Sequence, residues 1–191
     1  MKVIAFNGSP RKDGNTHHLL THVCDALEKE GVETELFQLG GQAIRGCMAC
    51  YKCATNKNKQ CSIKNDVLNT CIEKMLAADG ILIGSPTYFC NVSTEVKALI
   101  DRAGIVVRTN GDLLKRKLGA AVVAVRRAGS TQVFDAINQF FTINQMIIPG
   151  SNYWNVGMGK AQGDVEKDEE GLTTMRILGE NMAWLLKKVA G

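Results

Sequence analysis

The sequence has few prolines, only three histidines and no long apolar run. Three prolines and an apolar content of 45% in 191 residues are compatible with one substantial core, so we predict a single domain over residues 1–191. No apolar stretch is long enough to cross a bilayer, and no membrane partner is expected. The net charge of +4 is too mild for a nucleic-acid groove and suits a phosphate-bearing ligand better.

The chain also lacks a leader-like start, internal repeats and low-complexity stretches. Its first residues, Met-Lys-Val-Ile-Ala-Phe, do not form a basic segment followed by a longer apolar one and a cleavage site. The seven cysteines are odd in number, which argues against a set of disulfides. We therefore expect a reducing, cytoplasmic location. His17, His18 and His22 fall in or near a predicted helix and are expected at the surface or as caps, so no catalytic side chain is assigned.

The first loop of the chain has the composition of a phosphate site. A short apolar strand over residues 3–6 is followed by a polar loop and then by helical periodicity through Leu19, Val23 and Leu27. The loop supplies flexible backbone, hydroxyl, amide and cationic groups at a helix N-terminus, where anions bind well. The residues concerned are Gly8, Ser9, Arg11, Lys12, Gly14, Asn15 and Thr16.

This loop matches neither the nucleoside-triphosphate motif nor the dinucleotide fingerprint. A phosphate monoester such as that of FMN fits what remains. A plain strand–helix turn capped by Asn15 or Thr16 would explain the cap but not the run of donors.

Strands and helices are predicted to alternate along the whole chain. Apolar runs predict further strands over residues 33–39, 80–84 and 119–125, and a broken one over 146–156. Helices are predicted over residues 66–78, with Asp66 as cap, and over 92–107, 131–145 and 171–189; Cys24 and Cys71 are expected in the core. Because continuous apolar strands are covered on both faces, we predict an α/β, doubly wound, five-stranded parallel sheet with ligands beyond the carboxyl ends of the strands.

Two loops at those carboxyl ends are candidates for ligand binding. The segment after the third strand combines a proline turn with two aromatic residues, which can lie along a flat ring: Pro86, Thr87, Tyr88, Phe89, Cys90, Asn91 and Val92. Two aromatic residues in a loop also occur through packing alone. The loop after the fourth strand contains Arg126, Arg127 and Gly129, and its arginines contact either ligand or water.

Four cysteines lie within fifteen residues, at Cys47, Cys50, Cys53 and Cys61. Three thiols spaced by three, followed by a fourth after a longer loop, are typical of an iron-sulfur cluster. Zinc is second, since structural zinc sites usually use two separate Cys-x-x-Cys pairs. Disulfides and inert loop thiols remain as alternatives.

Lysines surround these cysteines, at Lys52, Lys57, Lys59 and Lys64. Ammonium groups near an anionic cluster would stabilise it and raise its potential. A solvated, lysine-rich loop is the simpler interpretation for some of them.

Four segments together resemble the NADPH-dependent FMN reductase group of flavodoxin-like proteins, and the cysteine run resembles its iron-sulfur flavoprotein branch. These segments are residues 8–16, the Gly-Cys-x-x-Cys-x-x-Cys run, residues 85–89 and residues 97–102. The resemblance implies a flavodoxin-like fold and FMN, with its phosphate at Ser9, Arg11, Asn15 and Thr16 and its isoalloxazine against residues 86–92. It also implies a [4Fe-4S] cluster on the four cysteines, in a homodimer or homotetramer where cluster and flavin of neighbouring subunits approach.

The chain departs from the family pattern at Cys90, where relatives usually place glycine, and around Gly129, where relatives are richer in glycine. The function expected is flavin-dependent redox chemistry that couples two-electron to one-electron transfer through the cluster. The donor is expected to be NAD(P)H or a reduced carrier, and the acceptor a small molecule or a protein. The alternatives are a cluster-free NAD(P)H-dependent reductase of free flavin, quinones, azo or nitro compounds, and a zinc-binding structural module.

Overall fold

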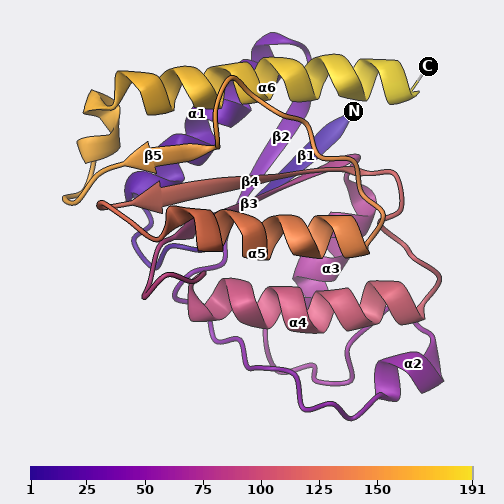
Figure 1. The fold of residues 1–191 in the computed structure, drawn as a ribbon. Coiled ribbons are helices and arrows are strands. Elements are labelled where there is room, and N and C mark those ends of the chain that lie inside the picture. Colours follow the sequence, from indigo (N-terminus) through magenta and orange to yellow (C-terminus); the bar gives the residue numbers. More distant parts are fainter. Residues whose placement is uncertain (191) are drawn as a thin grey trace.

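The computed structural model describes residues 1–190 and places a five-stranded parallel sheet at the centre of the molecule (Figure 1). The strands are β1 (Lys2–Asn7), β2 (Glu33–Gln38), β3 (Gly80–Pro86), β4 (Leu118–Val125) and β5 (Val156–Met158), in the order β2-β1-β3-β4-β5. The order reverses between β1 and β3, so the carboxyl ends of these two strands form the point where doubly wound sheets bind ligands. The predicted fold class is confirmed.

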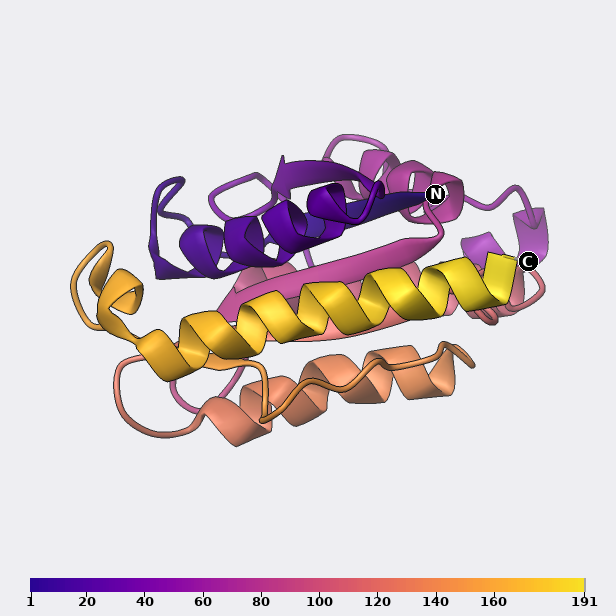
Figure 2. The same cartoon turned by 90° about the horizontal axis from the view of Figure 1, so that it is seen from above.

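Helices cover both faces of the sheet. On one face lie α1 (Asn15–Lys29) and α6 (Glu169–Ala190), and Figure 2 looks down on this face. On the other face lie α3 (Leu68–Ala77), α4 (Thr94–Thr109) and α5 (Ser130–Ile143). Two separate apolar clusters fill these layers, which is why β3 and β4 are apolar almost throughout.

Two short elements lie outside this layered arrangement. The helix α2 (Lys52–Asn56) follows β2 and packs against α4, on the side of α4 away from the sheet (Figure 1). A 3-10 turn, η1 (Asp164–Lys167), precedes α6. In the part of the chain described, no helix combines the length and the apolar character that a bilayer span requires.

The last strand differs from its prediction. Regular pairing with β4 begins only at Val156, and the expected strand over residues 146–156 is reduced to a single bridge between Ile147 and Leu118. Pro149 has no N–H to donate, and Gly150 and the polar residues after it favour a loop. The chain therefore leaves the sheet after Ile147 and returns to it at Val156, where β5 begins.

Candidate functional sites

The loop between β1 and α1 is held against the next strand by its backbone. The N–H of Gly8 donates to the carbonyl of Gly84 at 2.8 Å, and a Cβ on Gly8 would meet Val96 Cγ2 at 2.2 Å. The hydroxyl of Ser9 accepts the N–H of Arg11 at 3.2 Å, which closes the loop upon itself. Gly14 precedes α1 in an extended conformation and no side chain caps the helix, so the first N–H groups of α1 are free for a ligand.

The loop after β3 closes in a tight turn from Tyr88 to Asn91. These two residues exchange backbone hydrogen bonds of 2.9 and 3.0 Å, and the central pair, Phe89 and Cys90, has φ angles of 47° and 58°. Two successive positive φ angles are typical of a type I′ turn, which favours glycine and asparagine over bulkier residues. Phe89 is fully exposed at the tip, and Cys90 lies against Gly129, where an added Cβ would meet its sulfur at 2.8 Å.

These two loops face one another across a pocket at the carboxyl edge of the sheet, here called the edge pocket. Its volume is about 190 Å³, and it is bounded by the loops after β1, β3, β4 and β5. The residues that line it are Arg11, Asn15, Thr16, Pro86, Thr87, Tyr88, Ala124, Val125, Arg126, Gly159 and Lys160.

The edge pocket brings together residues that are about seventy positions apart in the sequence. Six of the predicted cofactor-binding residues line it. Three come from the loop after β1 and the start of α1 (Arg11, Asn15 and Thr16), and three come from the end of β3 and the loop after it (Pro86, Thr87 and Tyr88). The other predicted residues lie outside its lining: Ser9, Lys12, Gly14, Phe89, Cys90, Asn91, Val92 and Gly129. Gly159 and Lys160 were missed because their strand was predicted too early; placing its end correctly would have put them at this edge.

The charges around the edge pocket suit an anionic, hydroxyl-bearing ligand. Arg11, Arg126 and Lys160 line it, and none of these side chains forms an ion pair within residues 1–190. The Oδ1 atom of Asn15 is buried there without a hydrogen-bond partner, while its Nδ2 atom donates to the Ala161 carbonyl at 2.9 Å. A phosphate would meet the cations, and a ribityl hydroxyl would satisfy the orphaned acceptor, so the residues present fit FMN.

The segment after β5 is fastened over the start of α1. Glu166 accepts hydrogen bonds from His18 Nδ1 at 2.7 Å and from His22 Nε2 at 3.0 Å, and Gln162 donates to Asp13 at 3.0 Å. The contact with His22, followed by that with His18, lowers the pKa of the Glu166 carboxyl. Two of the three histidines therefore help to close one side of the edge pocket.

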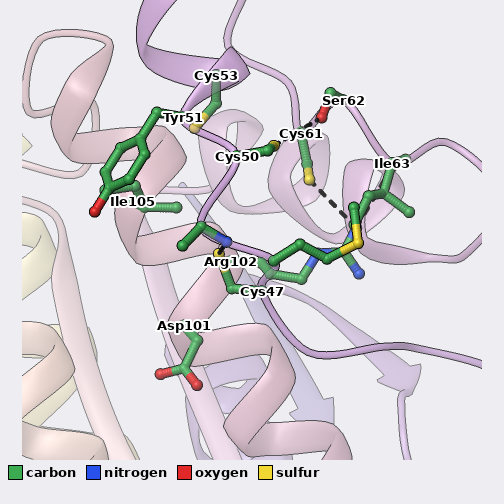
Figure 3. A pocket seen from close by; sticks show the side chains of 12 residues that line it. Cys47, Cys50, Tyr51, Cys53, Cys61, Ser62, Ile63, Asp101, Arg102 and Ile105 are labelled. Carbon is green, nitrogen blue, oxygen red and sulfur yellow. Dashed lines mark hydrogen bonds between the residues drawn. The ribbon is translucent and has the colours of Figure 1, made fainter.

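The four predicted cysteine ligands line a second pocket, here called the thiol pocket, of about 180 Å³. It lies between α4 and the stretch of residues 46–62, here called the thiol segment (Figure 3). Cys47 and Cys50 are exposed, Cys61 is half-buried and Cys53 is buried. Within residues 1–190, no three metal-binding side chains stand close enough together to share an ion.

The thiols differ in their surroundings. The hydroxyl of Ser62 lies 3.4 Å from Cys50 Sγ, and this contact, followed by the backbone N–H of Lys52, lowers the pKa of the Cys50 thiol. Cys61 is pinned through its backbone, because its N–H donates to Asn69 Oδ1 at 2.8 Å and its carbonyl accepts from Asn69 Nδ2 at 3.1 Å. A low thiol pKa favours the thiolate form that binds metals.

Backbone strain is concentrated in the thiol segment and in the turn after β3. Of the nine non-glycine residues with positive φ among those described, Ala49, Tyr51, Lys57 and Lys59 belong to the thiol segment, and Phe89 and Cys90 to the turn after β3. Such residues persist only where the surroundings impose them, and they gather at functional sites. The strain supports both regions as sites.

The remaining cysteines on helices are structural. Cys24 and Cys71 are buried in the two apolar clusters, and burial raises the pKa of each thiol to about 12. Their predicted place in the core is confirmed. The predicted cap Asp66 precedes α3, accepts the N–H of Leu68 at 3.2 Å and pairs with the buried Arg102. Arg102 is a functional candidate that the motifs of the sequence do not indicate; a charge on the apolar face of a predicted helix is the signal that points to it.

The sheet order, with the loop at the start of α1 and the edge pocket at its switch point, defines an α/β protein of the flavodoxin type. The sequence profile of the NADPH-dependent FMN reductase family matches residues 1–161, and the chain belongs to this family. It is therefore a flavin-dependent oxidoreductase whose cofactor is FMN.

Relatives agree with this family, and solved structures agree with the fold. The chain is 39% identical to an iron-sulfur flavoprotein of Methanocaldococcus jannaschii over 196 residues, which cover 99% of each chain. It is 28% identical to an iron-sulfur flavoprotein of Methanosarcina thermophila over 191 residues, covering 99% and 97%. RosB, solved with a bound riboflavin-phosphate derivative, has a TM-score of 0.76 at 18% identity, over 100% of this chain and 80% of that one. A WrbA-like flavodoxin from Agrobacterium tumefaciens has a TM-score of 0.67 at 14% identity, covering 98% and 97%.

Proposed function

We propose that the protein couples the two-electron chemistry of FMN to one-electron transfer through a [4Fe-4S] cluster bound by Cys47, Cys50, Cys53 and Cys61. The observation that carries this proposal is the convergence of all four cysteines on one pocket, although the last lies eight positions after the third. The relatives that are similar over their full length are named iron-sulfur flavoproteins, which agrees with it. The lowered pKa of Cys50 favours a thiolate ligand.

The edge pocket is proposed as the FMN site. The free N–H groups at the start of α1, together with Arg11 and Thr16, would bind the phosphate, because a helix N-terminus and a guanidinium both favour a dianion. Asn15 would accept a hydroxyl of the ribityl chain. Pro86, Thr87 and Tyr88 would lie along the ring, and the strained turn that follows would keep them in place.

When bound, FMN accepts a hydride and gives up electrons one at a time, while a cluster carries single electrons. The protein's own residues position these groups and exclude solvent, and no acid–base side chain is required of them. The edge pocket and the thiol pocket have no lining residue in common. Exchange between the two groups is therefore proposed to occur in a homodimer or homotetramer that brings one chain's thiol pocket to another's edge pocket.

A cluster-free FMN reductase is the second candidate. It is favoured by the spacing of the thiols, since no three ligating side chains among residues 1–190 share an ion site. In that case NAD(P)H would reduce FMN, and a small acceptor such as a quinone would take both electrons.

Protein prepared and handled without oxygen distinguishes these functions. The proposal predicts about four irons and four sulfides per chain, one FMN, and an electron paramagnetic resonance signal in the reduced state. One FMN with no metal, together with steady NAD(P)H oxidation, would leave the cluster-free reductase. Stoichiometric zinc would contradict the cluster and, with FMN still bound, would also leave the cluster-free reductase.

A further inference from the structure

Arg102 is a fully buried charge that lines the thiol pocket. It lies on α4 among the apolar residues Val96, Leu99 and Val106, and none of its surface is exposed. Figure 3 shows its side chain beside Cys61, at the edge of the group of four cysteines. A guanidinium that is shielded from water needs hydrogen-bond acceptors for its five N–H groups. The acceptors that Arg102 contacts therefore indicate its role.

Three partners of Arg102 flank the thiol segment, one before it and two after it. Its Nη1 atom donates to the carbonyl of Arg45 at 3.0 Å, and its Nη2 atom donates to the carbonyl of Ile63 at 3.5 Å. Both nitrogens also bond the carboxylate of Asp66, whose side chain is itself 95% buried. The guanidinium therefore joins the two ends of the thiol segment to α4.

Arg102 also reaches one of the proposed ligands directly. Its Nη2 atom donates to the sulfur of Cys61 at 3.4 Å (Figure 3). Its Nε atom is buried and has no hydrogen-bond partner among the described residues. An unsatisfied N–H group in the protein interior costs free energy. We therefore expect a bound group in the thiol pocket to supply the acceptor for this N–H.

The ion pair with Asp66 does not by itself account for Arg102. Replacing a buried pair by apolar residues of similar volume is often neutral or stabilising, so stability alone gives no reason for a charge here. Sulfur atoms of an iron-sulfur centre accept hydrogen bonds from N–H groups, and such bonds raise its potential. A guanidinium with one free N–H beside four thiols has the donors that such a centre requires.

We propose that Arg102 is the positioning residue of the cluster site, which orients Cys61 and donates hydrogen bonds to the sulfur atoms of the bound centre, while Asp66 fixes the guanidinium. This inference rests on the proposed function. The positive charge that stabilises the cluster is therefore assigned to Arg102 and not to the nearby lysines. Lys52, Lys57, Lys59 and Lys64 are exposed and none lines the thiol pocket, so solvent screens them.

The test uses anaerobically prepared full-length protein with the substitutions Arg102→Met, Arg102→Lys and Asp66→Asn. Arg108→Met is the control, since Arg108 lies on the same helix but is exposed and donates to the carbonyl of Ile143 instead. The measurements are the rate of iron release to a ferrous chelator, the cluster potential from a redox titration followed by electron paramagnetic resonance, and the FMN content.

We expect Arg102→Met to release iron about 10 to 100 times faster than the unmodified protein, as is usual when a partner of a metal ligand is removed. The cluster that remains should titrate at a more negative potential, and the FMN content should not change. Arg102→Lys retains the positive charge but not the forked guanidinium group. Its cluster potential should therefore lie between those of Arg102→Met and the unmodified protein, and its iron release should be nearly as fast as that of Arg102→Met. Arg108→Met should match the unmodified protein.

Other outcomes overturn the proposal in distinguishable ways. Unmodified protein without iron and sulfide would overturn the proposed function and this inference with it. A cluster in the unmodified protein, with unchanged iron release in Arg102→Lys and Asp66→Asn, would overturn the role of Arg102 alone. Faster release at an unchanged potential would make Arg102 a structural clamp and overturn its hydrogen bonds to the centre. If Arg102→Met does not fold, the other two variants decide by the same criteria.

Discussion

The edge pocket stands on the carboxyl ends of β1, β3, β4 and β5, whereas the thiol pocket stands on a segment whose only regular element is the five-residue helix α2. The first is positioned by the sheet, because the strand order alone brings the loops together. The second is positioned by a few polar side chains, namely Arg102, Asn69 and Asn110. The edge pocket is therefore formed whenever the whole domain folds. The thiol pocket, in contrast, can be altered by substituting a few side chains without loss of the fold.

The largest effect expected on the thiol side is the loss of the proposed cluster. Replacing any one of Cys47, Cys50, Cys53 and Cys61 by serine should remove most iron and sulfide, because each thiolate bonds a separate iron. FMN content should stay near that of the unmodified protein, since no cysteine lines the edge pocket. Iron, sulfide and flavin analysis of anaerobic protein measures all three quantities.

Cys24→Ala and Cys71→Ala are the controls for this experiment. Both thiols are buried in apolar clusters, so their replacement should leave the iron content unchanged. Equal iron in all six variants would contradict the ligand assignment. Loss of FMN together with iron would contradict the independence of the two pockets.

A pair of glycines tests the same comparison through stability. At Gly8, a new Cβ would meet Val96 Cγ2 at 2.2 Å and the backbone oxygen of Gly84 at 2.6 Å, whereas at Gly46 it would meet nothing within 4 Å. Gly8→Ala should lower the free energy of unfolding by roughly 2 to 3 kcal/mol and weaken FMN binding. Gly46→Ala should change it by less than about 0.5 kcal/mol.

Urea unfolding of the apoproteins measures both changes. A small effect at Gly8 would show that the loop after β1 can move away from β3. A large effect at Gly46 would show that the start of the thiol segment is as tightly placed as the edge pocket, and the contrast between the two regions would fail.

The phosphate assignment predicts a selective loss of affinity. Replacing Arg11 and Thr16 together by alanine should weaken FMN binding about 10- to 100-fold, which corresponds to the loss of hydrogen bonds to a charged group. Riboflavin, which has no phosphate, should lose much less. Fluorescence titration with both ligands measures the difference.

Gln162→Ala is the matched control, because it removes a contact between the segment after β5 and Asp13 without altering the start of α1. It should leave both affinities unchanged. An equal loss for FMN and riboflavin in the double variant would move the phosphate away from the start of α1.

The difference between the two regions also explains what the sequence could predict. Alternating strands and helices determine the sheet, and the sheet determines that Arg11 and Tyr88 share a pocket, so local patterns were sufficient there. The thiol segment has no such frame. The spacing of its cysteines predicted four cluster ligands. The contact between Cys61 and Arg102, however, joins residues 41 positions apart through side chains alone, and no periodic pattern in the sequence indicates it. The strained turn at Phe89 and Cys90 is a further case, since its residues do not favour the conformation they adopt.

The smallest effect expected concerns the segment that closes the edge pocket. Hydrogen bonds from His22 and His18 lower the pKa of Glu166 in the folded protein below its ordinary value of about 4.3. A lowered carboxyl pKa means that the unfolded chain binds the proton more tightly, so Glu166 stabilises the fold above about pH 4.3 and this contribution is lost as the pH falls through the folded-state value.

Because the side chain is 41% exposed, solvent screening limits the effect to a few tenths of a kcal/mol. Urea unfolding should therefore show Glu166→Gln slightly less stable than the unmodified protein at pH 6 and equal to it near pH 3. A difference for Glu166→Gln that stayed constant with pH would mean that its shape, and not its charge, fastens the segment to α1.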